Sequence, residues 1–172
     1  HTCNALGDVN NDGYLEIITG TYESKLFILD YLGNTLSGWP IDFEEFDIPG
    51  VDCPAVADFD NDGFNEFVIS RSINAGYGDG GIWRNYRGSL TVFNHDGTVQ
   101  WSKEWPIEEP TTEYYSYNLF TSPVIADVDG DNSLDLIVAR RTFTATGFDD
   151  VYYEMIYTVF DKDGNIKDGW PV

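Results

Sequence analysis

The chain has 172 residues and a formal net charge of −21, because it carries 30 acidic residues against 9 basic ones. This length allows one good hydrophobic core or a few stacked repeats. So strong a negative charge argues against nucleic acid and against anionic membrane surfaces as partners. No apolar run approaches the length that spans a membrane, so we expect no membrane insertion. The sequence begins at His1, which we interpret as the start of a processed product or an excised piece.

Three acidic segments have nearly the same sequence, and we call them acidic loop one (residues 8–16), acidic loop two (58–66) and acidic loop three (127–135). Each places oxygen-bearing side chains at its first, third, fifth and ninth positions. The sixth position is Gly in loops one and two and Asn132 in loop three, where a tight turn needs positive φ. The backbone carbonyl of the seventh position adds a further oxygen. Because Ca²⁺ takes about six to eight oxygen ligands, the spacing predicts a calcium site in each loop.

A polar hairpin turn and an EF-hand are the alternatives for these loops. Asn-Asp-Gly is common in turns, so one copy would leave the hairpin open, whereas three copies weigh against it. An EF-hand needs a bidentate Glu at the twelfth position and a helix on each side. The twelfth position here is Thr19, Ile69 or Val138, and the residues after each loop are typical of strands. The EF-hand is therefore disfavoured.

A second motif follows each acidic loop, and it consists of a glycine turn and then Trp-Pro, at 31–40, 95–106 and 162–171. The two motifs divide the chain into repeats 1–49, 50–115 and 116–172 of a single domain. Each repeat predicts four short strands. The first leads into the acidic loop (5–6, 54–57 and 123–126) and the second leaves it. The third precedes the glycine turn (25–29, 89–93 and 155–160), and the fourth ends at Trp-Pro. Four-stranded antiparallel repeats of this length are typical of β-propeller blades.

The acidic loops, the strands after them and the later Gly-Trp-Pro resemble FG-GAP/VCBS repeats, the calcium-bearing blades of integrin α-subunit propellers and of many secreted bacterial proteins. The resemblance extends over nearly the whole chain. It implies an all-β fold of three four-stranded antiparallel propeller blades, a partial propeller, with one Ca²⁺ between the first and second strands of each blade. By that pattern the ligands are Asp8, Asn10, Asp12, Tyr14 (backbone) and Glu16; Asp58, Asp60, Asp62, Phe64 (backbone) and Glu66; and Asp127, Asp129, Asp131, Ser133 (backbone) and Asp135.

Two departures from the pattern rank the three sites. Asn10 stands where the other loops carry Asp, so loop one has one charge fewer. Loop three lacks Gly at the sixth position. We therefore expect acidic loop two to be the strongest calcium site.

Cys3 and Cys53 stand at the same distance before acidic loops one and two, and the matching residue of the third repeat is Ser122. Equivalent positions on the innermost strands of adjacent blades crowd around a propeller axis, which brings the two cysteines towards disulfide range. Two buried free thiols are the alternative. Calcium loops of modest affinity suit an extracellular setting, where disulfides persist, and this favours the bond.

In an up-and-down blade the connections after the first and third strands share one edge, and those after the second and fourth share the other. The acidic loops and glycine turns therefore lie together on one edge. The long connections are expected on the opposite edge, at 41–51, 72–88, 107–118 and 142–153. Long loops on a rigid scaffold commonly carry binding residues.

All five arginines map to this opposite edge: Arg71, Arg84, Arg87, Arg140 and Arg141. Aromatic residues with arginines suit carbohydrate or protein recognition. We single out Trp83, Arg84, Tyr86 and Arg87 as the contact patch. For most of these residues the favoured alternative is pairing with nearby acids and packing of loops onto the blades. His95, in the glycine turn of the second repeat, is expected to be solvated.

Together these features predict a noncatalytic calcium-binding module, extracellular or on the cell surface, for adhesion, ligand recognition or self-assembly. No nucleophile elbow, phosphate loop or histidine metal site is present in the sequence. The alternative is a catalytic or noncatalytic fragment of a secreted propeller enzyme such as a polysaccharide lyase. Propellers close with about four to eight blades, so three blades imply self-association or a place in a larger propeller.

Overall fold

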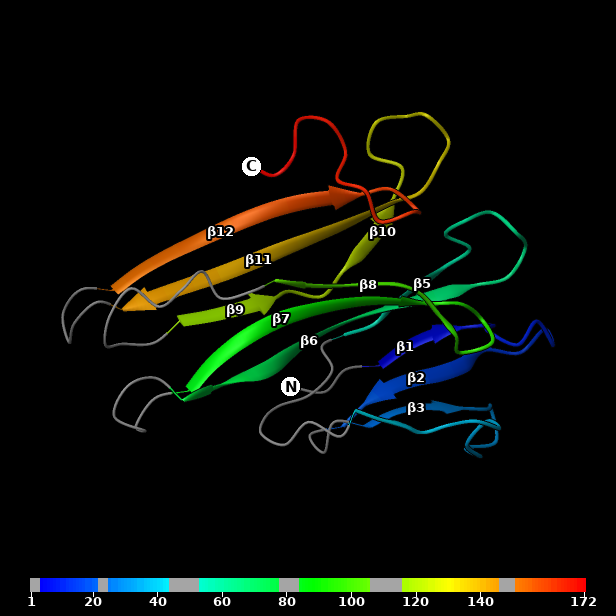
Figure 1. The fold of residues 1–172 in the computed structure, drawn as a ribbon. Helices are drawn as coiled ribbons and strands as arrows, with labels where there is room; N and C mark the ends of the chain where they lie inside the picture. Colours follow the sequence, from blue (N-terminus) through cyan, green and yellow to red (C-terminus); the bar gives the residue numbers. More distant parts are fainter. Residues whose placement is uncertain (1–3, 22–24, 44–52, 78–83, 106–115, 146–150) are drawn as a thin grey trace.

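The computed structural model describes residues 4–21, 25–43, 53–77, 84–105, 116–145 and 151–172 (Figure 1). For 72–77, 84–87, 105, 116–120, 142–145 and 151–152 it describes the backbone alone. The elements of this part of the chain are twelve β-strands, with no helix among them. Accordingly, the described residues contain no helical segment with the length and apolar character of a membrane span. The predicted all-β, antiparallel class is therefore confirmed.

The first repeat forms a four-stranded antiparallel sheet whose strands lie in chain order. Its strands are β1 (Asn4–Gly7), β2 (Glu16–Gly20), β3 (Lys25–Leu29) and β4 (Ile41–Asp42). Gly7 pairs with Glu16, so acidic loop one closes the β1–β2 hairpin as the sequence predicted. The Leu26–Ile41 pair attaches the short fourth strand to β3. This strand follows Trp39-Pro40, so the predictions that it ends at Trp-Pro and that 41–51 is a connection throughout are corrected.

The second repeat has the same order, with β5 (Ala55–Ala57), β6 (Glu66–Tyr77), β7 (Arg84–Phe93) and β8 (Val99–Trp105). The predicted long connection at 72–88 is wrong for most of its length, because β6 and β7 stay paired from Phe67–Phe93 out to Tyr77–Arg84. Polar and glycine residues in this range indicated a loop. An antiparallel strand with one face towards water nevertheless accepts such residues, since its stability comes from the ladder and from its other face.

The third repeat begins with a strand that was not predicted, β9 (Ser116–Phe120). The strands that follow it are β10 (Val124–Ala126), β11 (Asp135–Ala145) and β12 (Val151–Phe160). β12 pairs with one side of β11, and both β9 and β10 pair with the other side. Thr121 N donates a 2.8 Å hydrogen bond to Ala139 O between these two pairings, so β9 and β10 act as one interrupted strand.

Two further predictions of connections are corrected in this repeat. The range 107–118 includes the start of β9, and 142–153 includes the end of β11 and the start of β12. The predicted fourth strand is reduced to backbone bonds between Tyr157 and Val172 and a bridge from Phe160 to Ile166. A single parallel bridge between Tyr86 and Tyr117 joins repeats two and three into one eight-stranded sheet.

Among the described residues the core consists of two clusters, one on each face of the second repeat. Side chains alternate between the faces of a strand, so Phe67 and Ile69 face the first repeat while Val68 faces the third. The first cluster contains Val9, Ile18, Leu26, Ile28, Phe67, Ile69 and Phe93. The second contains Phe59, Val68, Leu90, Val92, Leu136, Val138 and Phe160. The repeats therefore pack face to face in chain order.

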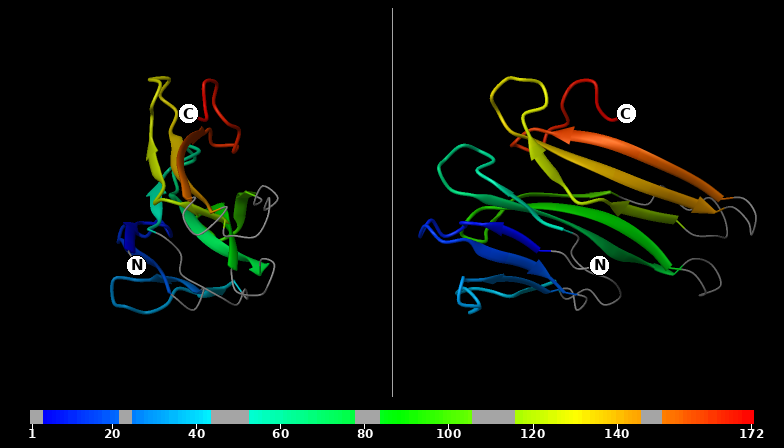
Figure 2. Two further views of the ribbon diagram at one scale, coloured as in Figure 1. Left: turned by 90° about the vertical axis from the view of Figure 1, so that its left-hand side faces the viewer. Right: turned by 180° about the vertical axis from the view of Figure 1, so that it is seen from behind.

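The acidic loops gather at one end of this stack, together with the turns that follow β3, β7 and β12 (Figures 1 and 2). The prediction that acidic loops and glycine turns share one edge is thus confirmed. The first strands also lie close together, because β5 contacts both β1 and β10. β1 comes so near β5 that a Cβ built on Gly7 would overlap the side chain of Val56.

Candidate metal sites

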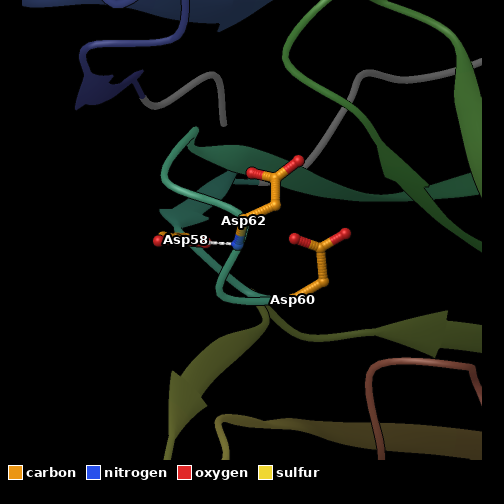
Figure 3. A group of neighbouring side chains, drawn as sticks. All are labelled: Asp58, Asp60 and Asp62. Atoms are coloured by element: carbon orange, nitrogen blue, oxygen red, sulfur yellow. Dashed lines mark hydrogen bonds between the residues drawn. The ribbon is translucent and has the colours of Figure 1, made fainter.

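The first aspartate of each acidic loop holds the loop closed through backbone hydrogen bonds. Asp58 Oδ1 accepts from Asp62 N at 3.0 Å (Figure 3), and its Oδ2 accepts from Gly63 N at 3.1 Å. Asp8 makes the equivalent pair of bonds in loop one. Asp127 also uses both oxygens, accepting from backbone nitrogens at 2.7 and 3.0 Å. These hydrogen bonds therefore hold the backbone of each loop in place without an ion.

Two positions of each loop, the fourth and the sixth, have left-handed backbone conformations. The φ values are 57° for Asn11 and 87° for Gly13, 64° for Asn61 and 95° for Gly63, and 79° for Gly130 and 67° for Asn132. The sequence prediction identified the sixth position and missed the fourth. The signal was present, because Asn or Gly occupies both positions in all three loops, and these are the residues that tolerate this conformation.

The acid at the ninth position begins the second strand of each repeat and is buried. Glu16, Glu66 and Asp135 are 0%, 1% and 1% exposed. Each accepts a hydrogen bond from the backbone nitrogen at the second position of its own loop, from Val9 at 3.0 Å, Phe59 at 2.8 Å and Val128 at 3.2 Å. This bond holds the carboxylate beside the start of its own loop.

Burial raises the pKa of both Glu16 and Glu66. The charges of Asp12 and Asp8 raise the pKa of Glu16 further. Glu16 Oε1 is buried and has no hydrogen-bond partner among the described residues. A buried carboxylate oxygen without a donor is costly, and a cation in loop one would offset that cost.

Acidic loop two brings three carboxylates together. Oxygens of Asp58, Asp60 and Asp62 lie within 4.8 Å of one another, and Asp60 and Asp62 project to the same side of the loop (Figure 3). Asp60 Oδ1 is buried without a partner in the described structure, and its Oδ2 accepts from Gln100 Nε2 at 3.2 Å. These oxygens form a compact set of hard ligands.

The seventh position couples two of the loops to the glycine turn of the same repeat. The ring of Tyr14 stacks on Tyr31 with centroids 4.5 Å apart, and Phe64 stacks on His95 at 4.2 Å. His95, which was expected to be solvated, is half-buried. The loops also contact each other, because Asn65 Nδ2 donates to Asp8 O at 2.8 Å.

Acidic loop three differs because a lysine enters it. Lys167 Nζ lies 2.7 Å from Asp129 Oδ2, 2.7 Å from Asp135 Oδ1 and 3.6 Å from Asp131 Oδ2. These hydrogen bonds raise the pKa of Lys167 well above its ordinary value and lower the pKa of Asp129. Oxygens of Asp127, Asp129 and Asp135 also lie within 4.8 Å of one another. The sequence prediction missed Lys167, which is distant from the loop in sequence.

Two of the arginines that were assigned to the opposite edge of the repeats pack on aromatic rings. The Arg71 guanidinium lies 4.4 Å from the ring centroid of Phe43, and that of Arg141 lies 4.9 Å from the ring of Tyr153. An arginine over an aromatic ring is a stabilising pair in its own right. These two arginines therefore pack on aromatic rings, as the alternative to the contact patch expected.

The predicted contact patch is only partly within the described structure. Trp83 lies outside the described residues. Arg84, Tyr86 and Arg87 belong to β7 rather than to a loop, and only their backbone is described. The patch therefore stays a prediction, with its location corrected from a loop to the end of a strand.

The predicted disulfide has one described member. Cys53 is partly buried just before β5, whereas Cys3 lies outside the described residues. The bond between Cys3 and Cys53 therefore stays a prediction.

The donor set of the three loops is oxygen from carboxylates and, in loop one, an amide. This set suits Ca²⁺ better than zinc or copper, which prefer Cys and His. Sequence comparison agrees with the loop pattern, because residues 8–69 match the family of FG-GAP-like repeats. This match extends over acidic loops one and two and confirms the resemblance for that part of the chain. No curated protein matches the sequence.

Proposed function

We propose that this chain, which contains an FG-GAP-like repeat over residues 8–69, is a noncatalytic calcium-binding scaffold of an extracellular or cell-surface protein. Its role is adhesion, ligand recognition or assembly with further units of its own kind. The observation that carries this proposal is the buried Oε1 atom of Glu16, which has no partner in the described structure, while the other oxygen of this carboxylate accepts from Val9 N in acidic loop one. The same loop geometry recurs twice more along the chain.

One Ca²⁺ in each loop would be held by the side chains of the first, third, fifth and ninth positions and by the carbonyl of the seventh. In loop two these residues are Asp58, Asp60, Asp62, Glu66 and Phe64. The clustered oxygens of the three aspartates support the assignment. The ion would neutralise acids that otherwise repel one another, so we expect binding and folding to be coupled.

A structural role for the ion fits the position of the ninth acid. Glu16 and Glu66 are almost completely inaccessible to solvent and begin β2 and β6. Side chains in this position are out of reach of a substrate, whereas they can fix the start of a strand. The loops also contact the neighbouring turns through the Tyr14–Tyr31 and Phe64–His95 stacks. Calcium in these loops would therefore stiffen one whole end of the stack.

We also propose that the repeats are blades of a β-propeller. Face-to-face packing of the repeats and the contacts of β5 with β1 and β10 support this arrangement. The exposed outer face of the third repeat supports a continuation of the stack. Tyr157 is 46% exposed, yet it is equivalent in register to Leu26 and Leu90, which are fully buried against the following repeat. A further unit of the same kind would cover Tyr157 in the same way.

Calcium titration by calorimetry, with thermal unfolding in calcium and in EDTA, tests the metal sites. Calcium is expected to raise the melting temperature of the wild-type chain. Asp62→Asn should remove part of this increase. Asp168→Asn, which makes the same charge change at an exposed position outside the loops, should leave it intact. No binding heat and no melting shift at millimolar calcium would refute the calcium assignment.

Sedimentation analysis tests the assembly role. We expect the chain to self-associate through its outer faces, and Tyr157→Glu should weaken that association because it puts a charge on the outer face of the third repeat. Glu154→Gln, on the same strand, serves as the control. A wild-type chain that stays monomeric at high concentration would contradict self-association.

A further inference from the structure

We propose that Lys167 is a built-in counter-cation of acidic loop three, so that this loop is held together without a metal and binds Ca²⁺ more weakly than loops one and two. The inference rests on the calcium sites proposed above. Its basis is the position of the lysine ammonium, which lies among the carboxylates of Asp129, Asp131 and Asp135. An ammonium in this place neutralises the same oxygens that a calcium ion would bind.

Loops one and three differ in the hydrogen bonding of one carboxylate oxygen of the ninth-position acid. In loop one, Glu16 Oε2 accepts the backbone bond and Oε1 is buried without a partner in the described structure. In loop three, Asp135 Oδ2 accepts the backbone bond and Oδ1 accepts from Lys167 Nζ at 2.7 Å. The oxygen that is unsatisfied in loop one is therefore satisfied by the lysine in loop three.

The position of Lys167 recurs in each repeat with a different side chain. Lys167 N donates to Val159 O at 3.0 Å, and Leu36 N donates to Ile28 O at 2.9 Å, so the two residues occupy the same place after the glycine turn. Gln100 stands at the same distance from the turn glycine of the second repeat, and its Nε2 donates to Asp60 Oδ2. The side chain at this position is thus apolar in repeat one, an amide in repeat two and an ammonium in repeat three, and the last two contact the acidic loop of their own repeat.

This series explains why the three loops should differ in calcium affinity. Calcium can bind Asp129 and Asp135 in loop three only after Lys167 Nζ gives up two short hydrogen bonds to these carboxylates. Charged hydrogen bonds of this kind are strong. Lys167 is also only 19% exposed at its side chain, so its displacement moves a charge from a partly enclosed site to water. Leu36 imposes no such competition on loop one.

Calcium titration followed by NMR of three loop glycines gives a separate reading of each loop. Gly13, Gly63 and Gly130 each donate their amide to the first aspartate of their own loop. In the wild-type chain we expect the Gly13 and Gly63 amides to shift at lower calcium than Gly130. Lys167→Met should move the Gly130 midpoint to lower calcium by at least about tenfold, as expected when charged hydrogen bonds no longer compete.

Stability without metal gives a second reading that does not depend on calcium binding. In EDTA, Lys167→Met should melt at a lower temperature than the wild-type chain, because Asp135 is left buried and charged without its partner. Calcium should restore the melting temperature of this variant. Lys167→Gln, which places in loop three the residue found beside loop two, should give an intermediate Gly130 midpoint.

Lys162→Met is the matched control, because Lys162 lies in the same turn and pairs with the exposed Asp163 instead. It should leave the Gly130 midpoint unchanged. The inference is overturned if Gly130 titrates together with Gly13 and Gly63 in the wild-type chain, or if Lys167→Met does not lower its midpoint. Failure of the calcium assignment itself has a different signature, namely unshifted Gly13 and Gly63 amides at millimolar calcium.

Discussion

The Nε1 atom of Trp101 donates a 2.9 Å hydrogen bond to the carbonyl oxygen of Lys162, which ties the second repeat to the glycine turn of the third. The indole also lies against Gly164, where an added Cβ would come within 3.0 Å of the ring. Trp39 makes the same approach to Gly97 one repeat earlier. Neighbouring repeats are thus connected in two ways, by the core clusters between them and by a tryptophan of one repeat that packs on the turn glycine of the next.

Substitution of Trp101 should therefore loosen the junction between repeats two and three. Trp101→Ala is expected to lower the free energy of unfolding by about 2–3 kcal/mol, somewhat less than for a fully buried Trp. Trp101→Phe keeps the packing on Gly164 and loses the hydrogen bond, at a cost of about 1 kcal/mol. Urea unfolding measures both. Equal losses for the two variants would show that packing on the glycine contributes nothing.

Gly7 should not tolerate a side chain, because β1 approaches β5 too closely. Gly7→Ala would drive its Cβ into Val56, and overpacking of this kind costs about 1–3 kcal/mol. The double variant Gly7→Ala/Val56→Ala should recover part of that loss, since the clashing methyl groups are gone. Thermal unfolding of these two variants and of the wild type checks this. A Gly7→Ala chain as stable as the wild type would contradict the close approach of the two strands.

Replacement of Glu66 by Gln should change the free energy of unfolding differently with and without calcium. In EDTA, Glu66→Gln is expected to match or exceed the wild type, because the amide oxygen can still accept from Phe59 N and no charge is buried. In calcium the variant should lose the stabilisation from loop two, which is about 2.7 kcal/mol when free calcium is 100 times the Kd. Chemical unfolding under both conditions gives the comparison.

Glu154→Gln is the control for this experiment, because it removes an exposed carboxylate on β12. It should show the wild-type gain in calcium. An identical calcium gain in Glu66→Gln and Glu154→Gln would rule Glu66 out as a ligand.

Much of the fold could be predicted from the sequence, because its signals are local. The acidic loops and turn glycines are short motifs, and they correctly marked the hairpins and the edge that these hairpins share. The outer parts of β6 and β7 were missed because their polar residues are typical of loops, whereas their pairing depends on strands brought together by the rest of the repeat. Strand propensity depends on context in this way.

The candidate site was predictable where it lies within one loop and unpredictable where it includes a distant residue. Lys167 reaches loop three from the turn after β12, and no spacing rule connects them. The sequence repeat also aligned Trp39 with Trp105, yet Trp101 makes the contact that Trp39 makes. Residues Val99–Trp105 of the second repeat form β8, whereas no named strand lies between β3 and β4 of the first repeat. The spacing from the turn glycine to the tryptophan that makes the contact therefore differs between the two repeats.

Asn132 should be replaceable by glycine but not by a β-branched residue. Its φ of 67° lies in the left-handed region, where Asn and Gly are tolerated and Val is strained by about 1–2 kcal/mol. Asn132→Gly should therefore change the free energy of unfolding by less than about 0.5 kcal/mol, whereas Asn132→Val should lower it. Asn132→Gly removes the side-chain amide without strain, and Asn132→Ala adds to that loss the strain of a Cβ at positive φ. If Val is accommodated as well as Gly, the loop backbone is not fixed as described.

The pairing of Cys3 with Cys53 is open to a direct chemical test. Alkylation of the unfolded chain without reductant, followed by mass measurement, should leave both cysteines unmodified, and prior reduction should expose both. A bond across a loop of this length is expected to add roughly 4 kcal/mol to stability in the chain-entropy account. The double variant Cys3→Ser/Cys53→Ser should therefore unfold at a lower temperature than the oxidised wild type. Labelling of both thiols before reduction would show that the cysteines are not bonded.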